Sequence, residues 1–172
     1  MLNAGVIGIG DMGSGLAKNL IKNGIPTSGL DLLPHRMEAF AALGGTGQST
    51  PREVAEQSDA VFVMVMNGDQ VKETLFGDHG LMSGLKQGSA IVLTATIKPS
   101  EARDIGERMT GSGIHLIDSP VSGGFPGAQN GTLTMMAAAP EPVLDQFQPF
   151  MEAVSANIHR VGTAPGQGQE VK

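Results

Sequence analysis

The sequence predicts an α/β fold in which helices cover both faces of a doubly wound, mostly parallel sheet. Two observations carry this prediction. Short apolar runs alternate with amphipathic stretches along most of the 172 residues, which is the pattern of repeated β–α–β units. The first apolar run also breaks into a glycine-rich segment, Gly8 to Gly13, before a stretch of helical character, as in a strand that turns directly into a helix.

Strands and helices are expected to alternate along a single domain, because the linker over residues 44–47 is too short to separate two. Thr50-Pro51 and Pro99-Ser100 carry helix-start signals, and Gly111 ends the helix that begins at Pro99. The expected strands are 4–9, 27–31, 60–66, 89–94, 114–118, 132–138 and 157–161. The expected helices are 14–23, 35–43, 51–57, 68–75, 99–110 and 140–154.

The glycine-rich segment has the spacing GxGxxG. Gly8 allows a tight turn after the strand, Gly10 allows the backbone to approach a diphosphate, and Gly13 allows the helix to pack closely on the sheet. The start of the following helix adds unpaired N–H groups and the positive end of its dipole, both of which favour an anion. The segment therefore indicates a Rossmann-type dinucleotide-binding unit, although such glycines can also serve a turn alone.

Asp31 is the expected partner of that segment, since it lies eighteen positions after Gly13 and closes the strand 27–31. A carboxylate there can accept hydrogen bonds from both ribose hydroxyls, and it would repel the 2′-phosphate of NADP, so NAD is the predicted cofactor. Arg36 is the nearby cation, five residues later. The side chain of Asp11, in the glycine-rich segment, is expected to point to solvent.

A second glycine-rich segment, from Asp118 to Gly124, follows the strand 114–118 at the expected carboxyl edge of the sheet, where open α/β folds bind ligands. The backbone N–H groups of Gly123 and Gly124 can form an anion-binding concavity, and Ser122 adds a hydroxyl, a combination that suits a carboxylate. A simple glycine-rich connection is the alternative. Asp118 is expected to shape its loop by accepting backbone N–H bonds.

Composition excludes several classes of protein. A net charge of −6 with 3% aromatic residues and no cluster of Lys or Arg argues against nucleic acid as a partner. With no Cys and four scattered His residues, we expect neither disulfides nor a metal site. The longest apolar run, Ala60 to Met66, is too short to span a bilayer, and no signal peptide is apparent, so a cytoplasmic protein is expected.

Four segments, spread in order over the whole chain, resemble the signatures of the β-hydroxyacid dehydrogenase family. They are residues 8–13, 118–124, 127–136 and 166–172. The resemblance implies hydride transfer between NAD and a small hydroxyacid, with Lys172 as catalytic acid/base and Ser122, Gly123 and Gly124 holding the substrate carboxylate. The cofactor-binding residues that it implies are Gly8, Ile9, Gly10, Asp11, Met12, Gly13, Asp31, Met66, Asn67 and Thr96.

The resemblance also implies that residues 1–162 form the NAD-binding domain and that 163–172 begin an interdomain helix. The family continues into an all-helical domain that completes the substrate site and supplies homo-oligomer contacts, so this chain alone is expected to bind NAD but to be inactive. L-threonate is the favoured substrate, with 3-hydroxyisobutyrate and tartronate semialdehyde as alternatives. A non-catalytic NAD-binding sensor is the alternative from another class.

Overall fold

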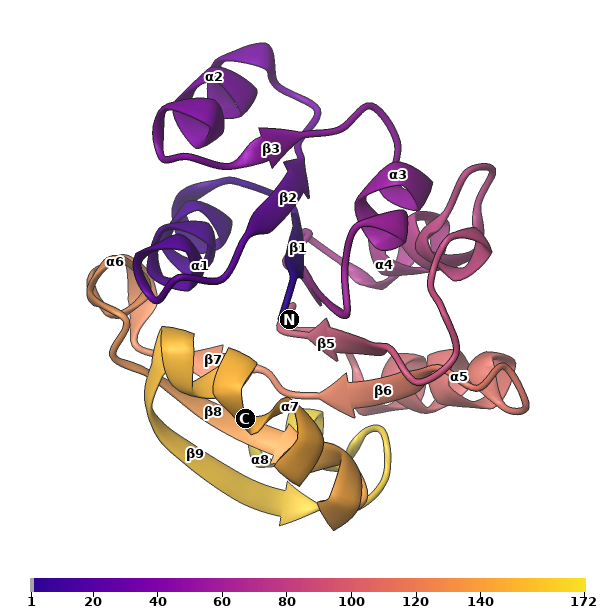
Figure 1. The fold of residues 1–172 in the computed structure, drawn as a ribbon. Helices are drawn as coiled ribbons and strands as arrows, with labels where there is room; N and C mark the ends of the chain where they lie inside the picture. Colours follow the sequence, from indigo (N-terminus) through magenta and orange to yellow (C-terminus); the bar gives the residue numbers. More distant parts are fainter. Residues whose placement is uncertain (1) are drawn as a thin grey trace.

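The computed structural model describes residues 2–172 and contains one mixed sheet flanked by helices (Figure 1). The strands are β1 (Ala4–Ile7), β2 (Thr27–Leu30), β3 (Thr46–Gly47), β4 (Ala60–Val63), β5 (Ala90–Leu93), β6 (His115–Asp118), β7 (Val121–Ser122), β8 (Leu133–Ala138) and β9 (Ser155–Gly162). The helices are α1 (Asp11–Lys22), α2 (Pro34–Ala42), α3 (Pro51–Glu56), α4 (Gly68–Phe76), the 3-10 turn η1 (Leu81–Ser83), α5 (Pro99–Met109), α6 (Gly124–Asn130), α7 (Glu141–Val154) and α8 (Gln167–Val171).

The sheet order is β3-β2-β1-β4-β5-β6-β8-β7, with β9 on the other side of β8. The strands from β3 to β6 are parallel to their neighbours, whereas β8 is antiparallel to β6 and β7 and parallel to β9. The chain winds from β1 outward to β3 and then returns to β4 on the other side of β1. This reversal makes the sheet doubly wound, which confirms the predicted fold class.

Two apolar cores lie on the two faces of the sheet. Val6 and Phe62 pack with α1 and α7 on one face, whereas Ile7 and Val61 pack with α3, α4 and α5 on the other, since successive side chains of a strand point to opposite faces. Figure 1 shows α1 and α3 on opposite sides of β1. Phe62 is fully buried, and such burial contributes about 1.5–3 kcal/mol. No helix in the described part of the chain is long and apolar enough to cross a membrane.

The strands predicted at 4–9 and 60–66 end earlier than expected, at Ile7 and Val63. The apolar residues that follow leave the sheet at its carboxyl edge and form the loops of the candidate site. Helix α1 conversely begins at Asp11, three residues before the predicted start. The third glycine of the GxGxxG segment therefore lies inside the helix rather than in the turn before it.

Helix α6 and the short strands β3 and β7 were not predicted, because all three lie in or beside glycine-rich sequence, which is typical of loops. Helix α6 contains glycine and proline, which are poor helix formers. Its position comes from α1: a Cβ on Gly15 would lie 2.5 Å from the carbonyl carbon of Ala128, and the buried Asn19 Nδ2 donates to Ala128 O at 2.8 Å. Tertiary contacts therefore hold this helix where local propensity does not.

Ser119 offers a test of the packing beside β6. Its hydroxyl is fully buried and has no hydrogen-bond partner among the described residues. Ser119→Ala is therefore expected to leave the free energy of unfolding unchanged or to raise it by up to about 1 kcal/mol, because no bond is lost. Ser58 is the matched control: it is also buried but donates to Val54 O at 2.6 Å, so Ser58→Ala should cost about 1 kcal/mol. Urea denaturation of both variants checks this, and equal losses would contradict it.

Candidate dinucleotide-binding site

The predicted cofactor residues gather at the carboxyl edge of the parallel strands. The glycine-rich segment follows β1, Asp31 follows β2, Met66 and Asn67 follow β4, and Thr96 follows β5. Parallel neighbouring strands place these loops along one edge, on both sides of the point where the strand order reverses.

The glycine-rich turn has the geometry that the sequence predicts. Gly8 has a φ of +90°, and a Cβ on it would lie 2.2 Å from Met64 O. A Cβ on Gly13 would lie 1.7 Å from Gly8 O, so α1 can approach β1 only through glycine. A Cβ on Gly10, in contrast, would meet only the Arg36 guanidinium, at 3.4 Å, which leaves the backbone open to a ligand.

The start of α1 supplies the anion-binding groups. The first N–H groups of a helix lack an intrahelical acceptor, and here Gly10 is the N-cap and gives no side-chain cap. The side chain of Asp11 is exposed, as predicted, so it leaves these N–H groups free to face a diphosphate.

Asp31 lies against the glycine-rich turn rather than in open solvent, and its side chain is only 6% exposed. Its Oδ2 accepts from the Ile9 N–H at 2.7 Å, and its Oδ1 accepts from the Leu33 N–H at 2.9 Å. The guanidinium of Arg36 lies 3.5 Å from the same Oδ2. Arg36 was noted in the sequence only as a nearby cation. Its place beside Gly10 depends on the first turn of α2, which brings its side chain back to the glycine-rich turn.

The predicted residues in the loops after β4 and β5 are exposed, although Ala95 and Ile97 beside Thr96 are buried. Met66 is 84% exposed, and its N–H donates to Gln70 Oε1 at 2.7 Å. Asn67 caps α4 by accepting from the Gln70 N–H, so its carboxamide oxygen is already used. Thr96 is exposed in the loop before α5.

The segment 122–124 and Lys172 meet at this edge, although 48 residues separate Gly124 from Lys172. Lys172 Nζ donates to Val121 O at 2.5 Å, directly before Ser122 in the chain. Gly123 and Gly124 have φ values of +131° and +61°, which side-chain-bearing residues rarely adopt. The structure thus brings the Lys172 ammonium to the backbone directly before Ser122 and the glycine turn. A cation, a hydroxyl and backbone N–H groups can in principle hold a carboxylate and move a proton.

Asp118 does accept backbone N–H bonds, but not from its own loop. Its Oδ2 accepts from Gly166 N–H at 2.7 Å, from Gly168 N–H at 3.1 Å and from Gln169 N–H at 3.3 Å. The Gln169 side chain donates to Oδ1 at 3.0 Å. Asp118 and Gln169 are both buried, and the sequence did not single out Gln169. Its only signal was its place in the closing segment 166–172 that resembles a family signature.

Burial raises the pKa of Asp118 above its ordinary value of 3.8, although hydrogen bonds from Gly166 and Gln169 act in the other direction. Asp104 differs: a hydrogen bond and ion pair with Lys72 at 2.9 Å lower its pKa. Carboxyl-carbon NMR titration should therefore place the Asp118 midpoint above that of Asp104. Because folding raises the Asp118 pKa, the folded state favours the protonated carboxyl more than the unfolded chain does. The contribution of Asp118 to the free energy of unfolding is therefore fully present at low pH and is lost as pH rises through the raised pKa. The opposite order of midpoints would contradict this.

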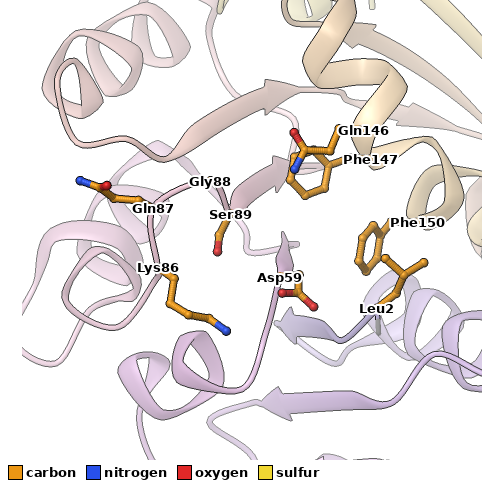
Figure 2. A pocket seen from close by; sticks show the side chains of 9 residues that line it. All are labelled: Leu2, Asp59, Lys86, Gln87, Gly88, Ser89, Gln146, Phe147 and Phe150. Carbon is orange, nitrogen blue, oxygen red and sulfur yellow. The ribbon is translucent and has the colours of Figure 1, made fainter.

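A cavity of 380 Å³ lies elsewhere, at the opposite edge of the sheet. Leu2, Asp59 and Ser89 precede β1, β4 and β5 there, and Figure 2 shows Phe147 and Phe150 of α7 lining its other side. None of the predicted site residues lines it. The candidate site is therefore the carboxyl edge and not this cavity.

A glycine-rich turn at a helix start, an acidic residue after β2 and a switch in strand order between β1 and β4 define a dinucleotide-binding domain. Residues 3–162 match the family described as the NAD binding domain of 6-phosphogluconate dehydrogenase. The chain belongs to the β-hydroxyacid dehydrogenase family, of which it forms an NAD(P)-binding domain. The resemblance seen in the sequence is thus confirmed.

Similar proteins agree with this assignment. L-threonate dehydrogenase of Escherichia coli K12 is 36% identical over 171 residues, which are 99% of this chain and 57% of that protein. Mitochondrial 3-hydroxyisobutyrate dehydrogenase of Mus musculus is 34% identical over 98% of this chain and 50% of its own length. The crystal structure of 3-hydroxyisobutyrate dehydrogenase from Salmonella typhimurium superposes with a TM-score of 0.94 at 33% identity, over 99% of this chain and 60% of that one. The chain thus spans between half and three fifths of the length of these relatives.

Proposed function

We propose that this chain binds NAD in preference to NADP and forms the cofactor half of an enzyme that oxidises a small hydroxyacid, with L-threonate as the favoured substrate. The observation that supports the proposal is the contact between Lys172 Nζ and the carbonyl of Val121, the residue directly before Ser122. The proposed proton-transfer group and the proposed cofactor-binding groups would thus share the carboxyl edge of the sheet.

Different residues of the chain would bind the cofactor, hold the substrate and transfer the proton. A bound NAD supplies the hydride acceptor. When the substrate carbon loses its hydride, the hydroxyl proton must leave as well, and the neutral amine of Lys172 takes it; in the reverse direction the ammonium returns it. The backbone N–H groups of Gly123 and Gly124, with the Ser122 hydroxyl, hold the substrate carboxylate. These groups would bind and orient the acid.

Hydroxyacid turnover tests the substrate assignment. Two proteins are assayed: the chain alone, and a fusion in which Lys172 is followed by the C-terminal remainder of E. coli L-threonate dehydrogenase. This fusion is called the completed chain below. Reduction of NAD is followed with L-threonate, 3-hydroxyisobutyrate and glycerate, the alcohol that is oxidised to tartronate semialdehyde, each at equal concentration. We expect turnover by the completed chain with L-threonate above the others and little turnover by the chain alone. NADH binding without turnover of any of the acids would favour the non-catalytic sensor instead.

Cofactor choice follows from Asp31 and Arg36. The carboxylate favours NAD, whereas the guanidinium beside it offsets part of the repulsion of a 2′-phosphate. Arg36→Ala is therefore expected to weaken NADPH binding about tenfold and to change NADH binding less than about threefold. The chain has no Trp or Tyr, so the fluorescence of the bound dinucleotide itself reports binding with little background. Equal losses for the two dinucleotides would contradict this assignment, and the exposed Lys18 of α1 provides the control, Lys18→Ala.

A further inference from the structure

The helix that carries Lys172 is too short to hold itself in place. Helix α8 has five residues, and isolated helices of that length are unstable because nucleation costs more than the few bonds return. Its N-cap is Gly166, with a φ of +97° and no side chain to accept the first N–H groups. Its position must therefore come from contacts outside the helix.

The missing cap is Asp118, at the end of β6. One oxygen of its carboxylate accepts the N–H groups of Gly166, Gly168 and Gln169, from 48 to 51 residues later in the chain. No cation forms an ion pair with Asp118 within residues 2–172, and the residue is fully buried. A buried carboxylate without a counter-charge is costly unless hydrogen bonds satisfy it, so these N–H groups and Asp118 require one another.

Gln169 extends the same anchor to the loop before α5. Its Nε2 donates to Ala95 O at 3.0 Å as well as to Asp118, and its Oε1 accepts from the Ile97 N–H at 3.1 Å. The amide thus holds the two residues on either side of Thr96. One buried side chain links the loop that carries Thr96 to the helix that carries Lys172.

Close backbone packing completes the anchor. A Cβ on Gly168 would lie 2.6 Å from Asp118 O and 2.7 Å from Met136 O, so α8 rests directly on β6 and β8. The Lys172 N–H then donates to Gly168 O at 3.3 Å, and Lys172 Nζ reaches Val121 O. The position of the ammonium thus follows from the position of one helical turn.

We propose that Asp118 and Gln169 are positioning residues, which hold α8 on the sheet and thereby set Lys172 beside Ser122. The inference rests on the proposed function of Lys172 as acid/base. Neither residue touches the proton in transfer; both act through the helix. Loss of either should therefore loosen α8 and slow hydride transfer while leaving the glycine-rich turn and its affinity for NAD intact.

Amide hydrogen exchange of the 172-residue chain tests the anchor without reference to catalysis. Asp118→Asn keeps the shape of the side chain, but its neutral amide oxygen is a weaker acceptor than a carboxylate oxygen. It also places an NH₂ group opposite Gln169 Nε2, which is itself a donor. We expect the Gly168 and Gln169 amides to exchange about tenfold faster or more. Gln169→Met is the second variant, and it remains informative if Asp118→Asn fails to fold. In this variant the Ile97 amide loses its acceptor and should also exchange about tenfold faster or more. Glu170→Gln is the control, because Glu170 lies on the same helix but pairs only with exposed Arg103.

The completed chain then tests the consequence. Both anchor variants should lower kcat about 10²-fold, because small displacements of a reacting group cost that much, while KM for NAD changes less than about threefold. Unchanged exchange in both variants overturns the proposal whatever the activity. Faster exchange with native kcat also overturns it, since the helix would then not control Lys172. Faster exchange together with native turnover by Lys172→Met would support the anchor and refute the proposed function of Lys172.

Discussion

Lys172→Met in the completed chain is expected to lower kcat for hydroxyacid oxidation by about 10³-fold, the scale of general acid–base catalysis. Methionine keeps the length and the apolar part of the side chain but cannot take a proton. The bond from Nζ to Val121 O is lost as well, so α8 is the element to monitor by hydrogen exchange. NADH affinity should change less than about twofold, because the glycine-rich turn lies at the start of α1.

Lys172→Arg separates proton transfer from charge. Arginine can still donate to Val121 O, but its guanidinium stays protonated in proteins, so it cannot act as a base. We expect a loss close to that of Lys172→Met. A completed chain with arginine that retains more than about a tenth of the native kcat would exclude Lys172 as the base, and the exposed Lys18→Met provides the control for a general loss of charge.

Gly13→Ala is expected to destabilise the fold by about 3 kcal/mol or more. The added Cβ would lie 1.7 Å from Gly8 O and 2.8 Å from Gly8 C, both backbone atoms, so α1 must move away from β1. The fully buried Leu16 and Leu20 of α1 would lose part of their packing with the sheet. Urea denaturation followed by circular dichroism measures the loss.

Gly10→Ala is the matched comparison, because this glycine is predicted to serve the ligand rather than the fold. Its backbone is extended, at φ −80° and ψ −153°, and a Cβ would meet only the flexible end of Arg36. The free energy of unfolding should change by less than about 0.5 kcal/mol, while NADH affinity falls about 100-fold, because the methyl group lies where the diphosphate approaches. Native NADH affinity in Gly10→Ala would place the diphosphate elsewhere.

The fold and the cofactor turn could be predicted because their signals are local. Alternating apolar runs and glycine spacing lie within single β–α units, and the demands on Gly8 and Gly13 concern atoms of the same turn or of the adjacent strand. Strand ends were predicted less well, because Met64 and Val65 are apolar and pack against the two cores although they follow the last residue of β4. Hydrophobicity cannot distinguish a side chain that packs from a strand from one that packs from the loop after it.

The anchor around Asp118 could not be predicted, because its donors are backbone groups about 50 residues away. A lone Asp after a strand gives no sign of which N–H groups it accepts, and the three here become neighbours only when α8 folds onto β6. Helix α6 was missed for a related reason, since its stability comes from Asn19 on α1 rather than from its own residues. In both cases tertiary contacts override local propensity.

Strand β9 matters for whether the sheets of two molecules can pair at high protein concentration. It lies beside β8 at the border of the sheet, and an open strand border invites pairing with another molecule. Its ladder with β8 is interrupted at two places, and Arg160 of β9 pairs with Asp145 of α7 at 2.7 Å. An incoming strand would meet an uneven border instead of a flat template, and such irregular edges disfavour sheet extension between molecules.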